Sequence, residues 1–115
     1  MNIGKDIQII KLDSVPSTNT YAKTLAKDGK DAFIVAREQP QGRGTKGRSF
    51  SSAIGGVYAT LLHFPKNAKA RELPRYMQHT AVAVCKTLER FSLTPQIKWP
   101  NDIWVDGKKI CGILI

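Results

Sequence analysis

The chain has 115 residues, of which 42% are hydrophobic and 23% charged, as is usual for a globular protein with one modest core. No apolar run approaches the roughly 18 residues of a membrane helix, and residues 1–6 lack the apolar core of a signal peptide. We therefore expect a cytoplasmic protein. The formal net charge of +9 predicts an acidic partner, which charge alone does not identify.

The first third of the chain predicts a strand, a helix and a second strand. Isoleucine and leucine favour a strand over residues 6–12, and residues 13–16 read as a turn because proline disfavours helix in the preceding residue. Ser17, Thr18 and Asn19 open a helix that ends before Gly29. A helix needs one cap, so the three polar residues either cap it or also bind a polar ligand. Residues 32–36 predict a strand buried on both faces.

A basic, glycine-rich loop follows this strand after residues 38–41. Its seven residues hold three glycines and three cations: Gly42, Arg43, Gly44, Thr45, Lys46, Gly47 and Arg48. Glycine lets backbone N–H groups approach a ligand, and arginine grips phosphate or carboxylate. The loop is not a Walker loop, because no Gly-Lys-Ser/Thr ending follows. It is either an anion-binding loop or a solvated turn.

The remaining elements are expected as follows. Residues 56–64 alternate as a strand, 65–74 form a polar loop, and 75–91 carry the stripe of the longest amphipathic helix. Residues 96–99 form a short strand, and Asp106 and Gly107 predict a hairpin turn between strands at 103–105 and 109–115. Cys85 and Cys111 show no metal-binding spacing, so we interpret them as buried free thiols.

Two further groups are candidates for chemistry. Pro100 ends the strand before it, so Asn101 and Asp102 are expected to project from a constrained turn. Lys109 lies between the polar hairpin tip and an apolar strand. Its ammonium is either held over a ligand pocket or is a solvated charge at a sheet edge.

Four segments in this order and at these separations resemble the N-terminal part of the catalytic domain of biotin protein ligase. They are residues 17–19, the loop at 42–48, the Lys-Trp-Pro-Asn-Asp run at 98–102 and residues 109–114. The resemblance runs from about Ser14 to the last residue. It implies an α/β (α+β) fold, a mixed sheet with helices packed on it, similar to class II aminoacyl-tRNA synthetases and incomplete in this chain.

The resemblance also implies an activity. The family joins biotin to ATP as biotinyl-5'-AMP, then transfers biotin to a lysine of a biotin carboxyl carrier domain, such as that of acetyl-CoA carboxylase. Biotin, ATP and Mg²⁺ are the expected ligands, with no resident metal. Homo-oligomers through an exposed sheet edge are expected, and a nucleic acid or membrane partner is not.

The resemblance also implies roles for individual residues, according to their positions in the matching motifs. The biotin head would meet Ser17, Thr18, Asn19 and Gln39, and its carboxylate Arg43, Gly44, Thr45 and Lys109. The nucleotide would meet Gly42, Arg43, Arg48, Phe50, Asn101 and Asp102, with Asp102 supporting the turn or Mg²⁺. Arg43 and Lys109 would be the catalytic cations, Lys109 bridging biotin and the α-phosphate.

Two departures from the family accompany the resemblance. Some members have arginine where this chain has Thr45, which removes one cationic contact to the adenylate. We also expect residues 1–115 to be a single partial domain, with no DNA-binding domain before Asp6. Later sheet strands and a small C-terminal β-barrel domain would be absent, so the chain itself is expected to be poorly active.

Three alternatives stay open. One is a lipoate or octanoyl ligase or transferase of the same fold. Another is a basic nucleic-acid-binding module, which is supported only by the net positive charge. The third is an inactive ligand-binding fragment.

Overall fold

The chain forms two compact units, each with its own sheet and its own hydrophobic core. The structure is a computed structural model that describes residues 6–115, and the units are Met1–Ala68 and Lys69–Ile115. In this described range, no helix is long and apolar enough to cross a membrane.

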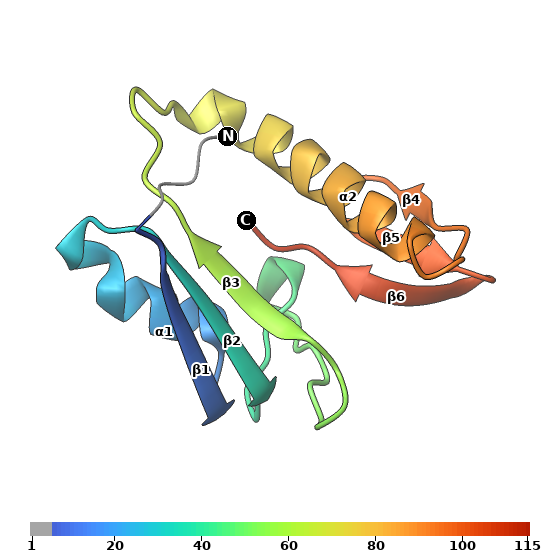
Figure 1. The fold of residues 1–115 in the computed structure, drawn as a ribbon, viewed down its shortest axis with the longest axis horizontal. Helices are drawn as coiled ribbons and strands as arrows, with labels where there is room; N and C mark the ends of the chain where they lie inside the picture. The colour runs from blue at the N-terminus through green and yellow to red at the C-terminus, as the bar shows by residue number, and fades with distance from the viewer. Residues whose placement is uncertain (1–5) are drawn as a thin grey trace. The chain divides into compact units, whose positions relative to one another are not determined.

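The first unit is a three-stranded mixed sheet with a helix on one face (Figure 1). Strand β1 (Gln8–Ser14) lies parallel to β2 (Ala32–Glu38), and helix α1 (Thr18–Leu25) connects them. Strand β3 (Tyr58–Leu62) pairs antiparallel with the other edge of β2. The expected mixed sheet with a packed helix is confirmed, and the α/β class with it.

Local sequence explains where α1 begins and ends. The Ser17 hydroxyl accepts a hydrogen bond from the Thr20 N–H, so Ser17 is the N-cap. A 3-10 turn (Ala26–Asp28) closes the helix at Gly29, whose φ of 65° suits a residue without Cβ. Ala22 of the helix packs on Ile34 of β2, and together they form the centre of the unit's core.

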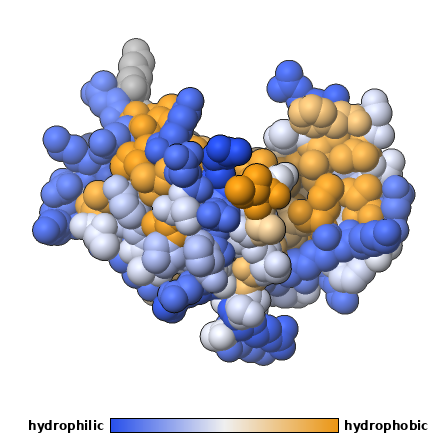
Figure 2. Space-filling view, turned by 90° about the horizontal axis from the view of Figure 1, so that it is seen from below, coloured by the Kyte–Doolittle hydropathy of each residue, from blue (hydrophilic) through white to orange (hydrophobic). Residues whose placement is uncertain are grey.

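The expectation that β2 is buried on both faces is wrong. Ala32, Ile34 and Ala36 are buried on the face that α1 covers. On the opposite face Phe33 is 37% exposed, and its neighbour Ile9 on β1 is 61% exposed. The reason is that the first unit itself has, in its described residues, one α-helix, α1, which packs on only one face of its sheet. Figure 2 shows hydrophobic residues at the surface of the molecule among hydrophilic ones.

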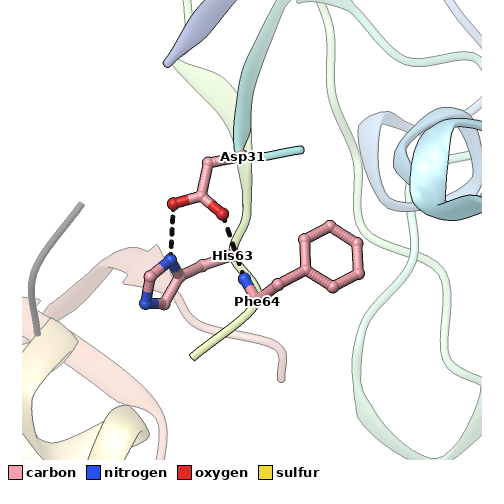
Figure 3. Close-up of polar contacts among 3 residues, drawn as sticks. All are labelled: Asp31, His63 and Phe64. Carbon is pink, nitrogen blue, oxygen red and sulfur yellow. Dashed lines mark hydrogen bonds and ion pairs between the residues drawn. The ribbon is translucent and has the colours of Figure 1, made fainter. Parts of the chain in front are cut away.

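An aspartate secures the end of the β2–β3 pair (Figure 3). Asp31 precedes β2, and its carboxylate contacts His63 Nδ1 at 2.7 Å and accepts a hydrogen bond from the Phe64 N–H at 3.1 Å. The Asp31 and His63 side chains are only 17% and 13% exposed. This contact ties the chain that leaves β3 to the chain that enters β2, at the end opposite the glycine loop.

The second unit is an antiparallel sheet packed against one long helix (Figure 1). A 3-10 turn (Ala70–Glu72) leads into α2 (Leu73–Glu89), and strands β4 (Gln96–Lys98), β5 (Asp102–Val105) and β6 (Lys108–Gly112) follow. Ala81 of α2 packs with Ile103 of β5 and Ile113 in a separate core. The predicted hairpin turn is confirmed, because Asp106 and Gly107 have φ of 51° and 75°.

Several expected boundaries need correction. Strand β1 extends through Ser14, which pairs with Glu38, so the expected turn starts later. Helix α2 starts at Leu73, with Pro74 in its first turn, where its missing N–H costs nothing. The last strand stops at Gly112. Ile113 instead donates its N–H to the Asn101 carbonyl and buries its side chain in the core, so residues 113–115 do not continue the ladder.

Candidate functional site

The N-terminus of α1 carries a hydrogen-bonded polar network. Ser17 is the cap, so Thr18 and Asn19 are not needed for capping. The backbone N–H and the hydroxyl of Thr18 lie 2.8 and 3.0 Å from Gln39 Oε1. The Thr18 hydroxyl also lies 2.8 Å from the hydroxyl of Thr60 on β3, which contacts the Asn19 amide. The network therefore joins α1, β3 and the end of β2.

Gln39 extends the network to the base of the glycine loop. Its Nε2 donates to Ser52 Oγ at 3.0 Å, and the Ser52 hydroxyl donates to the Phe50 carbonyl at 2.8 Å. The Gln39 N–H also bonds to the Ser52 carbonyl at 3.0 Å. Gln39 therefore links the polar residues of α1 to the segment that closes the loop.

The basic loop is closed by backbone hydrogen bonds. The Phe50 N–H donates to the Gly42 carbonyl at 2.8 Å, and the Gly44 N–H donates to the Arg48 carbonyl at 2.7 Å. The glycines stand at Gly-x-Gly-x-x-Gly spacing, but a three-residue 3-10 turn (Thr45–Gly47) lies within the run, and extended backbone at Arg48 follows it instead of the helix of a dinucleotide fold. The loop therefore does not have the backbone conformation of a dinucleotide-binding turn.

The cations of this loop face solvent. Arg43, Lys46 and Arg48 are exposed, and among the described residues no ion pair involves them. No acidic residue lies between residues 42 and 50 to neutralise them. Three adjacent uncompensated cations on a closed loop favour binding of an anion.

Gly42 lies so close to neighbouring atoms that only glycine fits at this position. A Cβ there would overlap the Phe50 carbonyl oxygen and the Ser52 hydroxyl, and would lie 3.1 Å from Gln39 Nε2. At Gly44 an added Cβ would meet nothing nearer than 3.6 Å. The position of Gly42 therefore keeps the loop base against the polar network.

The second unit gathers the other candidates on one face of its sheet. Asp102, Trp104 and Lys109 lie opposite the face that packs on α2, as the register places Ile103 in the core. Lys109 Nζ is 2.9 Å from Asp102 Oδ1, with the side chains 40% and 24% exposed. Lys98 Nζ lies 4.7 Å from the centroid of the Trp104 ring, a cation–π contact.

The turn between β4 and β5 differs from the expectation. Asp102 is the first residue of β5, paired with Lys98 and Gly112, and does not project from the turn. Its side chain is fixed by Lys109 across the sheet instead of supporting the turn. Asn101 stays in the turn after the cis Trp99–Pro100 bond, and its carbonyl accepts from the Ile113 N–H.

The two cysteines are free, as predicted, but they are half-buried and not buried. Both contribute to the core between α2 and the sheet. Burial raises the pKa of the Cys111 thiol, and the nearby Lys109 ammonium partly offsets this. Burial also raises the pKa of Cys85. Neither thiol has the lowered pKa of a reactive cysteine.

The structure thus places the sequence candidates in two groups. The first unit holds Ser17, Thr18, Asn19, Gln39, Gly42, Arg43, Gly44, Thr45, Arg48 and Phe50, and the second holds Asn101, Asp102 and Lys109. The sequence analysis missed Thr60 and Ser52, and it missed the pairing of Asp102 with Lys109. The strand alternation did place Thr60 with Tyr58 and Leu62, and this was the available signal.

A metal site is not formed by these side chains alone. Within residues 6–115, no group of three or more His, Cys, Asp or Glu could hold a metal ion, and the Asp102 carboxylate is already paired with Lys109. Mg²⁺ usually keeps several waters and binds through substrate phosphates.

The chain matches known proteins along most of its length. The model of the Biotin/lipoate A/B protein ligase family matches residues 12–115. The bifunctional ligase/repressor BirA of Bacillus subtilis is 36% identical over 110 residues, which are 92% of this chain and 34% of the relative. The biotin–[acetyl-CoA-carboxylase] ligase of Paracoccus denitrificans is 33% identical over 106 residues, which are 86% of this chain and 42% of the relative.

A solved structure shares the fold. The biotin protein ligase from Aquifex aeolicus, in complex with biotin and ATP, aligns with a TM-score of 0.72 and 32% sequence identity. The alignment covers 93% of this chain and 45% of that one. This chain therefore spans less than half the length of each of these three proteins.

Proposed function

This chain belongs to the Biotin/lipoate A/B protein ligase family, and we propose that it serves ATP-dependent activation and transfer of biotin. Biotin would be activated as biotinyl-5'-AMP and transferred to a lysine of a biotin carboxyl carrier domain. The observation that carries the proposal is the Thr18–Gln39–Ser52 chain, which connects polar side chains to the base of a cationic loop. A substrate with a polar head and a carboxylate needs both features.

The reaction has two balanced steps. A carboxylate oxygen of biotin attacks the α-phosphorus of ATP, and the bond to the β-phosphate breaks to release pyrophosphate. The carrier lysine amine then attacks the acyl carbon, loses a proton and releases AMP. The first step brings two anions together, so cations positioned in advance lower its barrier.

The loop supplies this charge in the first unit. Arg43 and the Gly44–Thr45 backbone would close over the carboxylate and α-phosphate, and Arg48 would meet the nucleotide phosphates. Their exposure without acidic neighbours supports this role. Phe50 would lie near the adenine. Its backbone closes the loop through Gly42 and Ser52, so adenine contact and loop closure would be linked.

By resemblance to the family, Lys109 of the second unit would be the other catalytic cation. It would bridge the biotin carbonyl and the α-phosphate. The Asp102 carboxylate, 2.9 Å away, would hold the ammonium in place on its own sheet. Asn101 would lie by the adenine. Most of the gain from Lys109 would come in the transition state, where charge at the phosphorus is greatest.

Titration of the 115-residue chain with biotin, lipoate and a DNA duplex tests the proposal. We expect biotin to bind and lipoate to bind more weakly, because lipoate lacks hydrogen-bonding groups on its ring and leaves buried polar groups unpaired, at about 1–3 kcal/mol each. Equal binding of biotin and lipoate would instead support the lipoate branch of the family. Binding of the duplex alone would support the nucleic-acid alternative.

The carrier and the location are finer proposals. The relative from Paracoccus is named for acetyl-CoA carboxylase, which supports that carrier for this chain. Incubation with biotin, ATP and an isolated carrier domain, followed by its intact mass, tests this choice. A cytoplasmic location stays a prediction from the sequence.

A further inference from the structure

We infer that Thr60 is a positioning residue that turns the Asn19 amide so that its oxygen, and not its nitrogen, is offered to the ligand. Thr60 lies on β3 and belongs to none of the motifs that identify the site. The part of the inference that concerns biotin rests on the proposed function. The part that concerns the amide rests only on the hydrogen-bond network.

The orientation of Gln39 starts the argument. A backbone N–H can only donate, and that of Thr18 points at Gln39 Oε1 from 2.8 Å. The Gln39 atom facing Thr18 is therefore the oxygen. The Gln39 nitrogen must then face Ser52 Oγ, which it does at 3.0 Å.

Counting hydroxyl protons fixes the next two contacts. Thr18 Oγ1 lies 3.0 Å from the same Gln39 oxygen, which carries no hydrogen, so the Thr18 hydroxyl must donate its one proton there. At its 2.8 Å contact with Thr60, Thr18 can then only accept. Thr60 must donate, and this uses the only proton of Thr60.

The same count decides Asn19. The structure places Asn19 Oδ1 at Thr60 Oγ1. With both hydroxyl protons used, however, Thr60 Oγ1 has none left to donate and can only accept from the amide group. If the amide atom at this contact were the oxygen, the contacts Thr18–Gln39, Thr18–Thr60 and Thr60–Asn19 would have only the two hydroxyl protons between them. One of these contacts would then bring two oxygen lone pairs together without a proton. If the amide atom is the nitrogen, every contact has a proton. The oxygen and nitrogen of a side-chain amide have nearly the same shape, so the hydrogen-bond network decides which way the group faces.

This polarity has a consequence for binding. In the inferred orientation, Asn19 Oδ1 is turned away from Thr60 and becomes a free acceptor on a half-buried residue. Gln39 Nε2 keeps a second N–H beyond the one it gives Ser52. The network thus offers an acceptor from Asn19 and a donor from Gln39. A cyclic urea carries N–H donors beside a carbonyl acceptor, so the biotin head matches this pair.

Nuclear Overhauser effects in the ¹⁵N,¹³C-labelled 115-residue chain test the amide orientation without any ligand. We expect cross-peaks from the Asn19 side-chain NH₂ protons to the Thr60 methyl and Hβ protons. Thr60→Val should also speed hydrogen exchange of these NH₂ protons, because they lose their acceptor. Absence of the cross-peaks in a folded, assigned wild-type chain would overturn the inference.

Biotin titration tests the consequence. Thr60→Val keeps the shape and removes the hydroxyl, and we expect about tenfold weaker binding. Thr60→Ser keeps the hydroxyl and should restore the affinity. Thr24→Val is the matched control, since it removes an exposed α1 hydroxyl that donates only to the Tyr21 carbonyl. We expect its biotin affinity to stay at the wild-type value.

The outcomes separate the two proposals. Unchanged biotin affinity in Thr60→Val, or no recovery in Thr60→Ser, would overturn the role of Thr60 in binding. If the wild-type chain shows the cross-peaks but does not bind biotin, the amide orientation is supported and the proposed function of this chain is contradicted.

Discussion

Gly42→Ala tests whether the loop base must lie against the polar network. The added Cβ would overlap a backbone atom, the Phe50 carbonyl oxygen, which no side-chain rotation can move away. It would also overlap Ser52 Oγ, the acceptor of Gln39 Nε2. Relief therefore requires the backbone near Phe50 to shift and the Gln39–Ser52 bond to break.

The magnitude follows from these two effects. Inserting a methyl group into a filled site costs about 1–3 kcal/mol, and losing a hydrogen bond costs about 1 kcal/mol more. We expect Gly42→Ala to lower the free energy of unfolding of the first unit by about 2–4 kcal/mol. Gly44→Ala is the matched control in the same loop, with the nearest contact at 3.6 Å. It should change stability by no more than about 0.5 kcal/mol.

Urea titration followed by backbone amide signals of the first unit is the appropriate assay. Both tryptophans, Trp99 and Trp104, lie in the second unit, so fluorescence would report on the wrong part of the chain. Biotin affinity should fall in Gly42→Ala, because Gln39 loses its partner Ser52. If Gly42→Ala matched Gly44→Ala in stability and in affinity, the close-approach argument would be refuted.

Four further predictions concern other residues. Arg43→Ala should weaken binding of biotinyl-5'-AMP far more than that of biotin, because the guanidinium is proposed to face the phosphate, which only the adenylate carries. Calorimetry with both ligands measures this, and equal losses would argue against it. In a protein of full family length, Lys109→Ala should reduce adenylate formation, measured by pyrophosphate release, with little loss of biotin binding, and Lys109→Arg should not restore the rate. Its cost in stability should stay below about 1 kcal/mol because the pair with Asp102 is partly exposed. Asp31→Ala should lower the free energy of unfolding of the first unit by about 1–3 kcal/mol, because the Phe64 N–H and His63 lose the carboxylate that they contact. Asp13→Ala is the control and should be near neutral, because the ion pair of Asp13 is exposed. Burial raises the pKa of the Cys111 thiol, so the folded chain holds this proton more tightly than the unfolded chain. This stability contribution is therefore present below the unfolded pKa and is lost as pH rises toward the folded pKa, and Cys111→Ala should flatten that part of the pH–stability curve.

Local chemistry in the sequence was enough to predict most helices and strands and the glycine-rich loop at residues 42–48. The Ser17 cap and Gly29 set the ends of the first helical segment, and Asp106 with Gly107 set the hairpin, because such residues act through their immediate neighbours. The motifs around residues 42–48 and 98–102 were enough for the family, which the match to residues 12–115 bears out. These features depend on a few residues adjacent in the chain.

The tertiary structure decided what depends on partners distant in the chain. Periodicity could not show that Ala32, Ile34 and Ala36 of β2 are buried while Phe33 is exposed, because burial depends on which elements pack on each face. The sequence predicted a strand through the final apolar residues. In the structure, Ile113 donates its N–H to the carbonyl of Asn101, which precedes β5, and its side chain is buried in the core. Thr60 lies 42 positions from Thr18, and their contact needs the β2–β3 register and the position of α1 together. Hydrogen-bond polarity at the site is a property of that three-dimensional arrangement, and no local pattern contains it.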